Sequence, residues 1–331
     1  MSKKQTRTLL ILLALLAVLG IVFAAVKLSA KKKEQAAAAK TAAAKQEAVV
    51  SQKVYTAFSW TRNGEKYAFT RQGNVWYWDA DKAFPLNANY LTKLANTLNS
   101  LSPVQTIRDG DALRAYGLDA PAFTLTATAK DGTKNTFALG GSAVNSDGNY
   151  YLMVNGDADK LYVVDATLHD ELAADVLAMM QLPDLPVLQT GDLKTLEVRG
   201  TADTRLAAQA KKSGEKTTVS WYAGEKDVTK NAAVKSLISA VSSMTVASAR
   251  FYKPTAAQLS QCGLSSPAAV VTLQYTDAKG AAQTLTLSVG KAADDGENRY
   301  VRLGGDDTVY AMTASKLTAL LSVAENGLSA D

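Results

Sequence analysis

The sequence predicts an α+β fold: two tandem copies of one module, each an antiparallel sheet covered by helices, behind an apolar N-terminal segment. Short segments of alternating apolar and polar residues, separated by tight-turn residues, predict antiparallel strands with one buried face. The second half of the chain also repeats the first at an offset of about 145 residues, which predicts two equivalent units. We expect an anchor at residues 1–29, a stalk at 30–53, and modules at 54–186 and 187–331.

The anchor is predicted from an uncharged run of 18 residues that begins at Leu9 and ends at Val26. This length is within the range that spans a bilayer as a helix, and it exceeds the ~7–15 residues of a secretory signal core. A cleaved signal is the alternative, with a small-residue site near Ala24 or Ala30, but the lysines at 31–33 disfavour cleavage. We expect an uncleaved transmembrane helix that holds the protein in the bilayer.

The orientation of this anchor rests on two signals that disagree. A count of flanking positive charges favours a cytoplasmic C-terminal side, because more lysines follow the run than precede it. A short basic tail, an apolar run and a large body together are typical of a signal-anchor with an exported body. We expect a single-pass cell-membrane protein whose body is extracytoplasmic.

The stalk and the body differ in charge. Residues 30–50 are rich in Ala, Lys, Gln and Glu and lack Gly and Pro, which predicts a semi-rigid helical stalk. Residues 1–45 hold nine Lys or Arg and one acid, which leaves 27 basic and 30 acidic residues in 46–331. The body is therefore mildly acidic and lacks the positive field of a nucleic-acid-binding protein, so no nucleic-acid partner is expected.

Each module is expected to open with strands joined by tight turns. Asn63 and Gly64 form a strong hairpin signal between the apolar segments 58–61 and 67–69, and residues 219–222 supply a counterpart strand in the second module.

A helix with one apolar stripe follows in each module, and another helix closes it. The first stripe is Leu91, Leu94, Leu98 and Leu101, matched by Val234, Leu237, Val241 and Met244. The closing stripe is Leu168, Leu172, Val176 and Met179, matched by Leu317, Leu320 and Leu321.

A Gly-Leu-x-x-Pro turn occurs in both copies. Gly117 and Gly263 stand where a helix end favours a left-handed residue, and Pro121 and Pro267 stop the helix before the next strand. Alternating hairpins follow and end in Gly140 and Gly290, before a Tyr-Tyr or an Arg-Tyr strand.

This order of features resembles the bacterial domain-of-unknown-function 4340 family over most of the chain, from about Val75 to the C-terminus. The resemblance implies a membrane-anchored protein of a kind often encoded beside ABC-2-type exporters and gliding-motility-like permease components. It implies no catalytic residues. The second turn departs from the first, because Cys262 and Ser265 replace Tyr116 and Asp119.

Candidate chemistry is sparse. His169 is the sole histidine, and a general base or metal ligand there would need carboxylate partners alone, so a surface position is the simpler interpretation. Cys262 is the sole cysteine, which rules out an intrachain disulfide and favours a packing role.

Asp and Asn gather with Gly in several loops, but without EF-hand spacing, so turn roles are favoured over weak calcium binding. These loops are 109–111, 145–149, 157–159 and 294–297.

Aromatic residues offer a candidate ligand or partner surface. Trp76 and Trp78 share one face of a strand, and Trp221 occupies an equivalent strand. Such an aromatic strand under a helix usually belongs to the core.

We therefore expect a non-enzymatic accessory or scaffold protein that contacts an envelope partner of the ABC-type permease class. No catalytic, cofactor or metal residues are assigned. A module that binds cell-wall glycan or a small ligand and an unrecognised hydrolase are the two alternatives.

Overall fold

The computed structural model describes residues 49–144, 148–213 and 216–328, and the expected anchor and most of the stalk lie outside these residues. None of the helices in these ranges is long and apolar enough to cross a membrane. The chain divides into two compact units, each described here by itself. The first runs to Ala83 and continues as Ala88–Ala174, and the second comprises Phe84–Asn87 and the chain from Asp175 onward.

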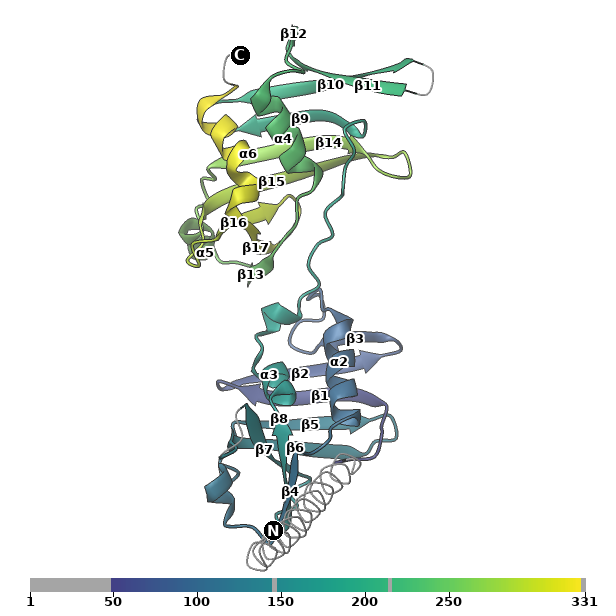
Figure 1. Ribbon diagram of the computed structural model, residues 1–331, viewed down its shortest axis with the longest axis vertical. Coiled ribbons are helices and arrows are strands. Elements are labelled where there is room, and N and C mark those ends of the chain that lie inside the picture. The colour runs from purple at the N-terminus through teal and green to yellow at the C-terminus, as the bar shows by residue number, and fades with distance from the viewer. Residues whose placement is uncertain (1–48, 145–147, 214–215, 329–331) are drawn as a thin grey trace, which may run out of the picture. The chain divides into compact units, whose positions relative to one another are not determined.

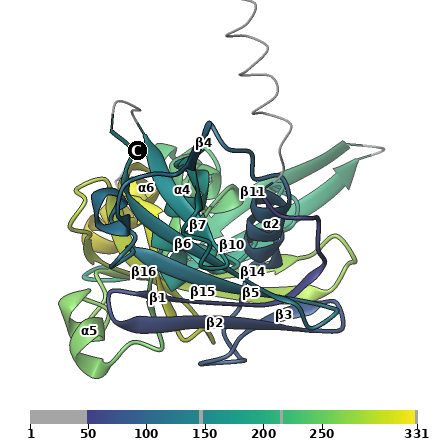
Figure 2. The same cartoon turned by 90° about the horizontal axis from the view of Figure 1, so that it is seen from below.

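The first unit is built on an eight-stranded antiparallel sheet of order β3-β2-β1-β5-β6-β7-β8-β4. Helices α2 (Ala88–Asn99) and α3 (Thr167–Ala173) pack on the sheet and on each other, and Figure 2 shows α2 to one side of β1, β2 and β5. The 3-10 helix η1 (Leu113–Tyr116) packs with strand residues of β7 and β8. The strands are β1 (Tyr55–Arg62), β2 (Glu65–Gln72), β3 (Val75–Trp78), β4 (Gln105–Arg108), β5 (Phe123–Ala129), β6 (Lys134–Ser142), β7 (Asn149–Val154) and β8 (Lys160–Asp165).

The second unit is built on a nine-stranded antiparallel sheet of order β12-β11-β10-β9-β14-β15-β16-β17-β13. Helices α4 (Ala232–Ser242) and α6 (Ala314–Asn326) lie side by side on one face of it (Figure 1). The unit also holds α5 (Ala256–Gln261) and the 3-10 helix η2 (Val176–Met179). The strands are β9 (Leu193–Arg199), β10 (Thr204–Ser213), β11 (Lys216–Ala223), β12 (Lys226–Asp227), β13 (Ser248–Tyr252), β14 (Ala269–Thr276), β15 (Ala282–Ala292), β16 (Asn298–Leu303) and β17 (Thr308–Thr313).

The two units share one order of elements along the chain and one order of strands across the sheet. Strands β1, β2 and β3 correspond to β9, β10 and β11, and the two-residue strand β12 is an addition in the second unit. Helix α2 corresponds to α4, α3 to α6, β4 to β13, and the meander β5–β8 to β14–β17. The internal repeat and the antiparallel α+β class are thus confirmed.

The predicted apolar stripes form the core between helix and sheet. Leu91 and Leu94 on α2 are fully buried, as are Val234, Leu237 and Val241 on α4. Gly117 and Gly263 have φ angles of 66° and 71°, so the left-handed conformation predicted at both turns is confirmed.

One predicted helix is shorter than its apolar period indicates. Leu168 and Leu172 lie on α3, but α3 ends at Ala173, and Val176 and Met179 belong to the separate helix η2. Ala174 is extended, with φ −65° and ψ 143°, because Asp175 starts a new turn by accepting a hydrogen bond from Leu177 N at 2.9 Å. An acidic N-cap therefore overrides a continuing apolar period.

Candidate functional site between paired helices

The tryptophans considered as a ligand surface lie mainly in the core. Trp76 is 7% exposed and its ring stacks on Phe58 with centroids 5.3 Å apart, and Trp221 is 2% exposed. Trp78 is half-buried and pairs with Phe69 across β2 and β3. Trp76 and Trp221 therefore present no open ring face on which a sugar could stack.

Two of the acidic loops named from the sequence, 157–159 and 294–297, act as turns, whereas residues 145–147 lie outside the residues that the structure describes. Asp131, Asp157 and Asp277 each accept a hydrogen bond from the backbone N–H two residues later, which is the geometry of an Asx turn. Among the described residues, no group of three or more His, Cys, Asp or Glu is arranged to hold a metal ion. The carboxylates therefore close the connections between strands.

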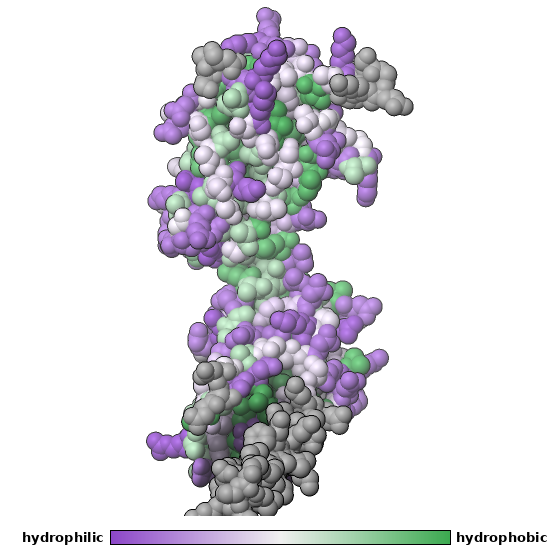
Figure 3. Space-filling view, in the orientation of Figure 1, coloured by the Kyte–Doolittle hydropathy of each residue, from purple (hydrophilic) through white to green (hydrophobic). Residues whose placement is uncertain are grey.

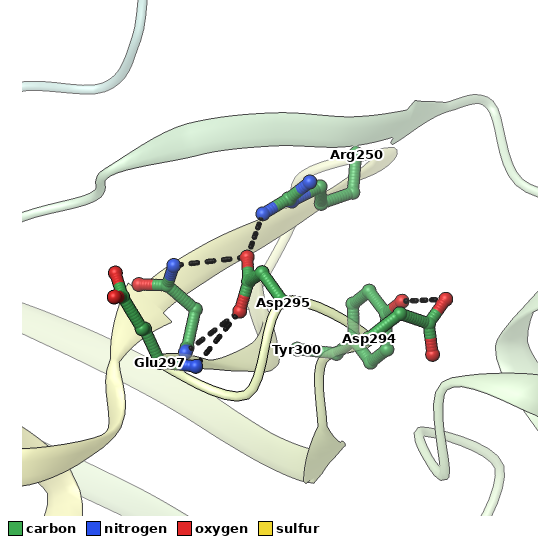
Figure 4. Close-up of polar contacts among 6 residues, drawn as sticks. Arg250, Asp294, Asp295, Glu297 and Tyr300 are labelled. Atoms are coloured by element: carbon green, nitrogen blue, oxygen red, sulfur yellow. Dashed lines mark hydrogen bonds and ion pairs between the residues drawn. The ribbon is translucent and has the colours of Figure 1, made fainter.

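The loop between β15 and β16 shows the fullest version of this arrangement (Figure 4). Asp295 accepts from the backbone N–H groups of Glu297 and Asn298, and it pairs with the guanidinium of Arg250 from β13. These bonds lower the pKa of the Asp295 carboxyl, the side-chain and backbone hydrogen bonds from Asn298 above all. Asp294 accepts from the hydroxyl of Tyr300 at 3.4 Å.

His169 and Cys262 lie in different units and in different settings. The His169 ring stacks on Tyr150 at 4.1 Å, and its Nδ1 lies 3.1 Å from Asp170 Oδ1. Cys262 is fully buried at the end of α5, and burial raises the pKa of its thiol. A thiol held protonated in the core is a poor nucleophile.

The least expected group is Glu171, on α3, which is only 4% exposed. Its Oε1 accepts from the hydroxyl of Thr97 at 3.0 Å and lies 3.5 Å from Lys93 Nζ, both on α2. Its Oε2 is buried and, among the described residues, has no hydrogen-bond partner. Burial is the main cause that raises the pKa of this carboxyl, while Thr97 and Lys93 act in the opposite direction.

The backbone around Glu171 is fixed by three side chains at the end of α3. Tyr90 donates its hydroxyl hydrogen to the Glu171 carbonyl, Trp60 Nε1 donates to the Leu172 carbonyl at 3.1 Å, and Arg62 Nε donates to the Ala173 carbonyl at 2.7 Å. Burial and the nearby Glu171 charge raise the pKa of Tyr90 to about 12, so its hydroxyl stays a donor. The last carbonyl groups of a seven-residue helix are thus satisfied by side chains.

The second unit replaces this polar contact with small and apolar residues. When Leu168 of α3 is aligned with Leu317 of α6, Leu320 takes the place of Glu171. On the preceding helices, Ser236 and Ala240 of α4 take the places of Lys93 and Thr97 of α2. Between α4 and α6 lies an open groove of about 710 Å³ lined largely by Ser, Thr and Ala. The surface over these helices is mostly pale, neither strongly hydrophobic nor strongly hydrophilic (Figure 3).

Comparison with known protein families shows the family to which the chain belongs. The profile of the family described as "Domain of unknown function (DUF4340)" matches residues 76–248 and again residues 221–326. The chain belongs to this family. The two DUF4340 matches begin at Trp76 on β3 and at Trp221 on β11, which are equivalent strands. No curated protein and no solved structure shows a significant match to the chain.

Glu171 is the residue of this DUF4340 chain that sequence reasoning missed. The sequence held a signal, because an acidic residue stands between Leu168 and Leu172 at a position where the second copy has Leu320. Burying a carboxylate of which one oxygen lacks a hydrogen bond lowers the stability of the fold. Residues that break the rule that buried polar groups are fully hydrogen-bonded are often found at functional sites. We treat the contact between α2 and α3 as the candidate site.

Proposed function

We propose that this DUF4340 protein is a single-pass membrane protein whose duplicated body stands outside the cytoplasm on a helical stalk. There it acts as an accessory or scaffold for an integral-membrane partner of the ABC-type permease class. The observation that carries the proposal is the uncharged run from Leu9 to Val26 ahead of a body made of two equivalent sheet-and-helix units.

Tethering to the membrane is the physical basis of this proposal. An anchor confines the body to a thin layer above the bilayer, so a partner in the same membrane meets it at a high effective concentration. Weak contacts over a broad surface are then sufficient for association, and a deep ligand pocket is not required. Two copies of one unit on a single chain double the surface available for such contacts.

The residue roles support the same proposal. Asp157 and Asp295 in the acidic loops bond to their own turns, and Trp76 and Trp221 are packed in the core. These groups have structural roles within their own units.

The experiment compares three versions of the chain in its native host. One is intact, one has residues 1–30 replaced by a cleaved export signal, and one has them replaced by an unrelated single-pass anchor. The measured quantity is the amount of ABC-type permease recovered with the protein from mild detergent, together with the activity of that transporter. We expect the unrelated anchor to preserve both and the released body to lose most of both. Equal recovery with the released body would refute the tethering role.

A further inference from the structure

One place beside the closing helix is filled by aromatic rings in the first unit. The His169 ring of α3 stacks on Tyr150 with centroids 4.1 Å apart, and Phe123 meets the His169 ring edge to face at 5.6 Å. Tyr150 is the second residue of β7, and Phe123 is the first residue of β5. Three rings from one helix and two strands therefore occupy this side of α3.

The second unit leaves the equivalent place open. When β7 is matched to β16, β5 to β14 and α3 to α6, the residues at the positions of Tyr150, Phe123 and His169 are Arg299, Ala269 and Thr318. A groove of about 390 Å³ runs along this side of α6, lined by Arg299 and by residues of the helix from Ala314 to Asn326. The two copies thus differ at one place, which is packed in the first unit and hollow in the second.

Arg299 is half-buried, and its guanidinium is fixed by the backbone. Its Nε and Nη2 both donate to the Gly290 carbonyl, at 3.1 and 2.7 Å. Among the described residues no acidic side chain pairs with Arg299, whereas Arg302 on the same strand pairs with Asp307. A guanidinium has five N–H donors in a planar fork, so the end formed by Nη1 and Nη2 can hold a carboxylate by two parallel hydrogen bonds. Arg299 is therefore a preorganised cation at the groove.

The opposite charge lies at the other end of the groove. Arg299 is paired with Met312 across β16 and β17, so it lies beside the start of α6 at Ala314. Glu325 lines the groove near the end of α6, is exposed, and makes no ion pair within the described part of the chain. From Ala314 to Glu325 an α-helix rises by about 16 Å. The groove thus carries a cation and an anion about three helical turns apart.

This spacing and these charges fit an extended peptide. A peptide advances by about 3.3 Å per residue when extended, so about five residues cover the distance. Its C-terminal carboxylate is the group that Arg299 binds, and its N-terminal amine is the group that Glu325 binds. Hydroxyl groups, which donate and accept hydrogen bonds and so suit the peptide backbone, line the groove between the two charges; they belong to Ser315, Thr318 and Ser322.

We propose that the groove beside α6 binds a short peptide with a free C-terminal carboxylate, held by Arg299 at one end and by Glu325 at the other. The first unit does not bind such a peptide at the equivalent place, because the rings of Tyr150, His169 and Phe123 fill it. The duplication has thus given one packed copy and one ligand-binding copy. This inference depends neither on the membrane anchor nor on the permease partner.

Calorimetric titration of the full-length protein in detergent with penta-alanine tests the proposal. Penta-alanine with a C-terminal amide and penta-alanine with an acetylated N-terminus are the matched probes, because each lacks one of the two charges. Arg299→Gln and Glu325→Gln remove the charges of the groove one at a time. Arg302→Gln is the matched control, since Arg302 lies on the same strand but pairs with Asp307.

A further variant fills the groove without removing side-chain packing. Arg299→Tyr, Thr318→His and Ala269→Phe together rebuild the aromatic cluster of the first unit in the second. Thermal denaturation is measured alongside the titrations to show that each variant is folded. The comparison of the three peptide forms uses the unmodified protein, so it tests the proposal even where a variant fails to fold.

We expect the acid form of penta-alanine to bind at least ten-fold more tightly than the amide form, and Arg299→Gln to weaken its binding at least ten-fold. The acetylated peptide and Glu325→Gln should each show binding at least three-fold weaker, and Arg302→Gln should stay within two-fold of the parent. The variant with the rebuilt cluster should not bind. Equal binding of the acid and amide forms, or no saturable binding below about 10 mM, would overturn the proposal. Acetate that displaces the peptide at an equal concentration would also overturn it, since the groove would then bind an isolated carboxylate.

Discussion

The Cα of Gly140 lies so close to the backbone of Tyr116 that a Cβ built there would be 2.2 Å from the Tyr116 carbonyl oxygen. The second unit repeats this contact, with a Cβ on Gly290 also 2.2 Å from the carbonyl oxygen of Cys262. The same backbone crossing has thus been kept in both copies while the side chain beside it changed from Tyr to Cys. Only glycine fits this crossing of the turn and the hairpin.

Gly140→Ala and Gly290→Ala should each lower the free energy of unfolding of their own unit by about 2 kcal/mol or more, because backbone must move to admit the methyl group. Gly191→Ala is the control, since nothing lies within 4 Å of its added Cβ and its φ is not positive. Chemical denaturation of each variant measures the change. A loss below 0.5 kcal/mol at both crossing positions would show that the contact is not tight.

The contact between α2 and α3 predicts a pH-dependent stability. The pKa of Glu171 is raised above its ordinary 4.5 in the folded unit. At a pH between these two pKa values, the folded protein therefore keeps a proton on Glu171 that the unfolded chain has lost. The stabilisation is fully present below the unfolded pKa and is lost as the pH rises through the folded pKa. Replacing Glu171→Leu together with Thr97→Ala, as in the second unit, should remove this slope and raise the free energy of unfolding at pH 8 by about 1 to 3 kcal/mol.

Unfolding of the first unit can be followed selectively in a Trp221→Phe background, because the other three tryptophans belong to that unit. Asp170→Ala serves as the control, as its side chain is 72% exposed beside Glu171. We expect the control to keep the pH slope of the parent. A double variant that is less stable than the parent at pH 8 would mean that the ionised Glu171 contact stabilises the fold.

His169 should be dispensable for function. Its ring stacks on Tyr150 near the surface, so His169→Ala should cost about 1 kcal/mol of unfolding free energy or less. Activity of the parent transport system should stay near that of the unmodified protein in cells. Loss of activity in a variant that remains folded and membrane-bound would point to a catalytic or metal role instead.

Patterns that repeat over short distances account for most of what could be predicted from the sequence. The leucine stripe of α2, the left-handed Gly117 and its counterpart Gly263 follow from local spacing and turn chemistry. The end of α3 could not be predicted from local spacing, because Val176 continues the apolar period while Asp175 caps a new turn.

The candidate site could not be predicted for a related reason. Glu171 and Thr97 are 74 residues apart, and their contact exists only once α2 and α3 have packed together on the sheet. The burial of Trp76 depends in the same way on Phe58, which a neighbouring part of the sheet supplies. Comparison of the two copies position by position, Glu171 against Leu320, is the one step that could have found the site.

Orientation is tested by a reporter enzyme that is active only outside the cytoplasm, fused after Asp331. We expect it to be active, because the signal-anchor layout exports the body. A silent reporter on a stable fusion would reverse the orientation and agree with the count of flanking lysines.

Membrane extraction tests the central claim of the account most directly. Membranes from cells that express the full chain are washed with high salt and then with alkaline carbonate, and the N-terminus of the retained protein is determined. The anchored-scaffold account predicts that the protein stays in the membrane pellet with the run from Leu9 to Val26 intact. Release into the wash, or a mature N-terminus near Ala25 or Lys31, would contradict it.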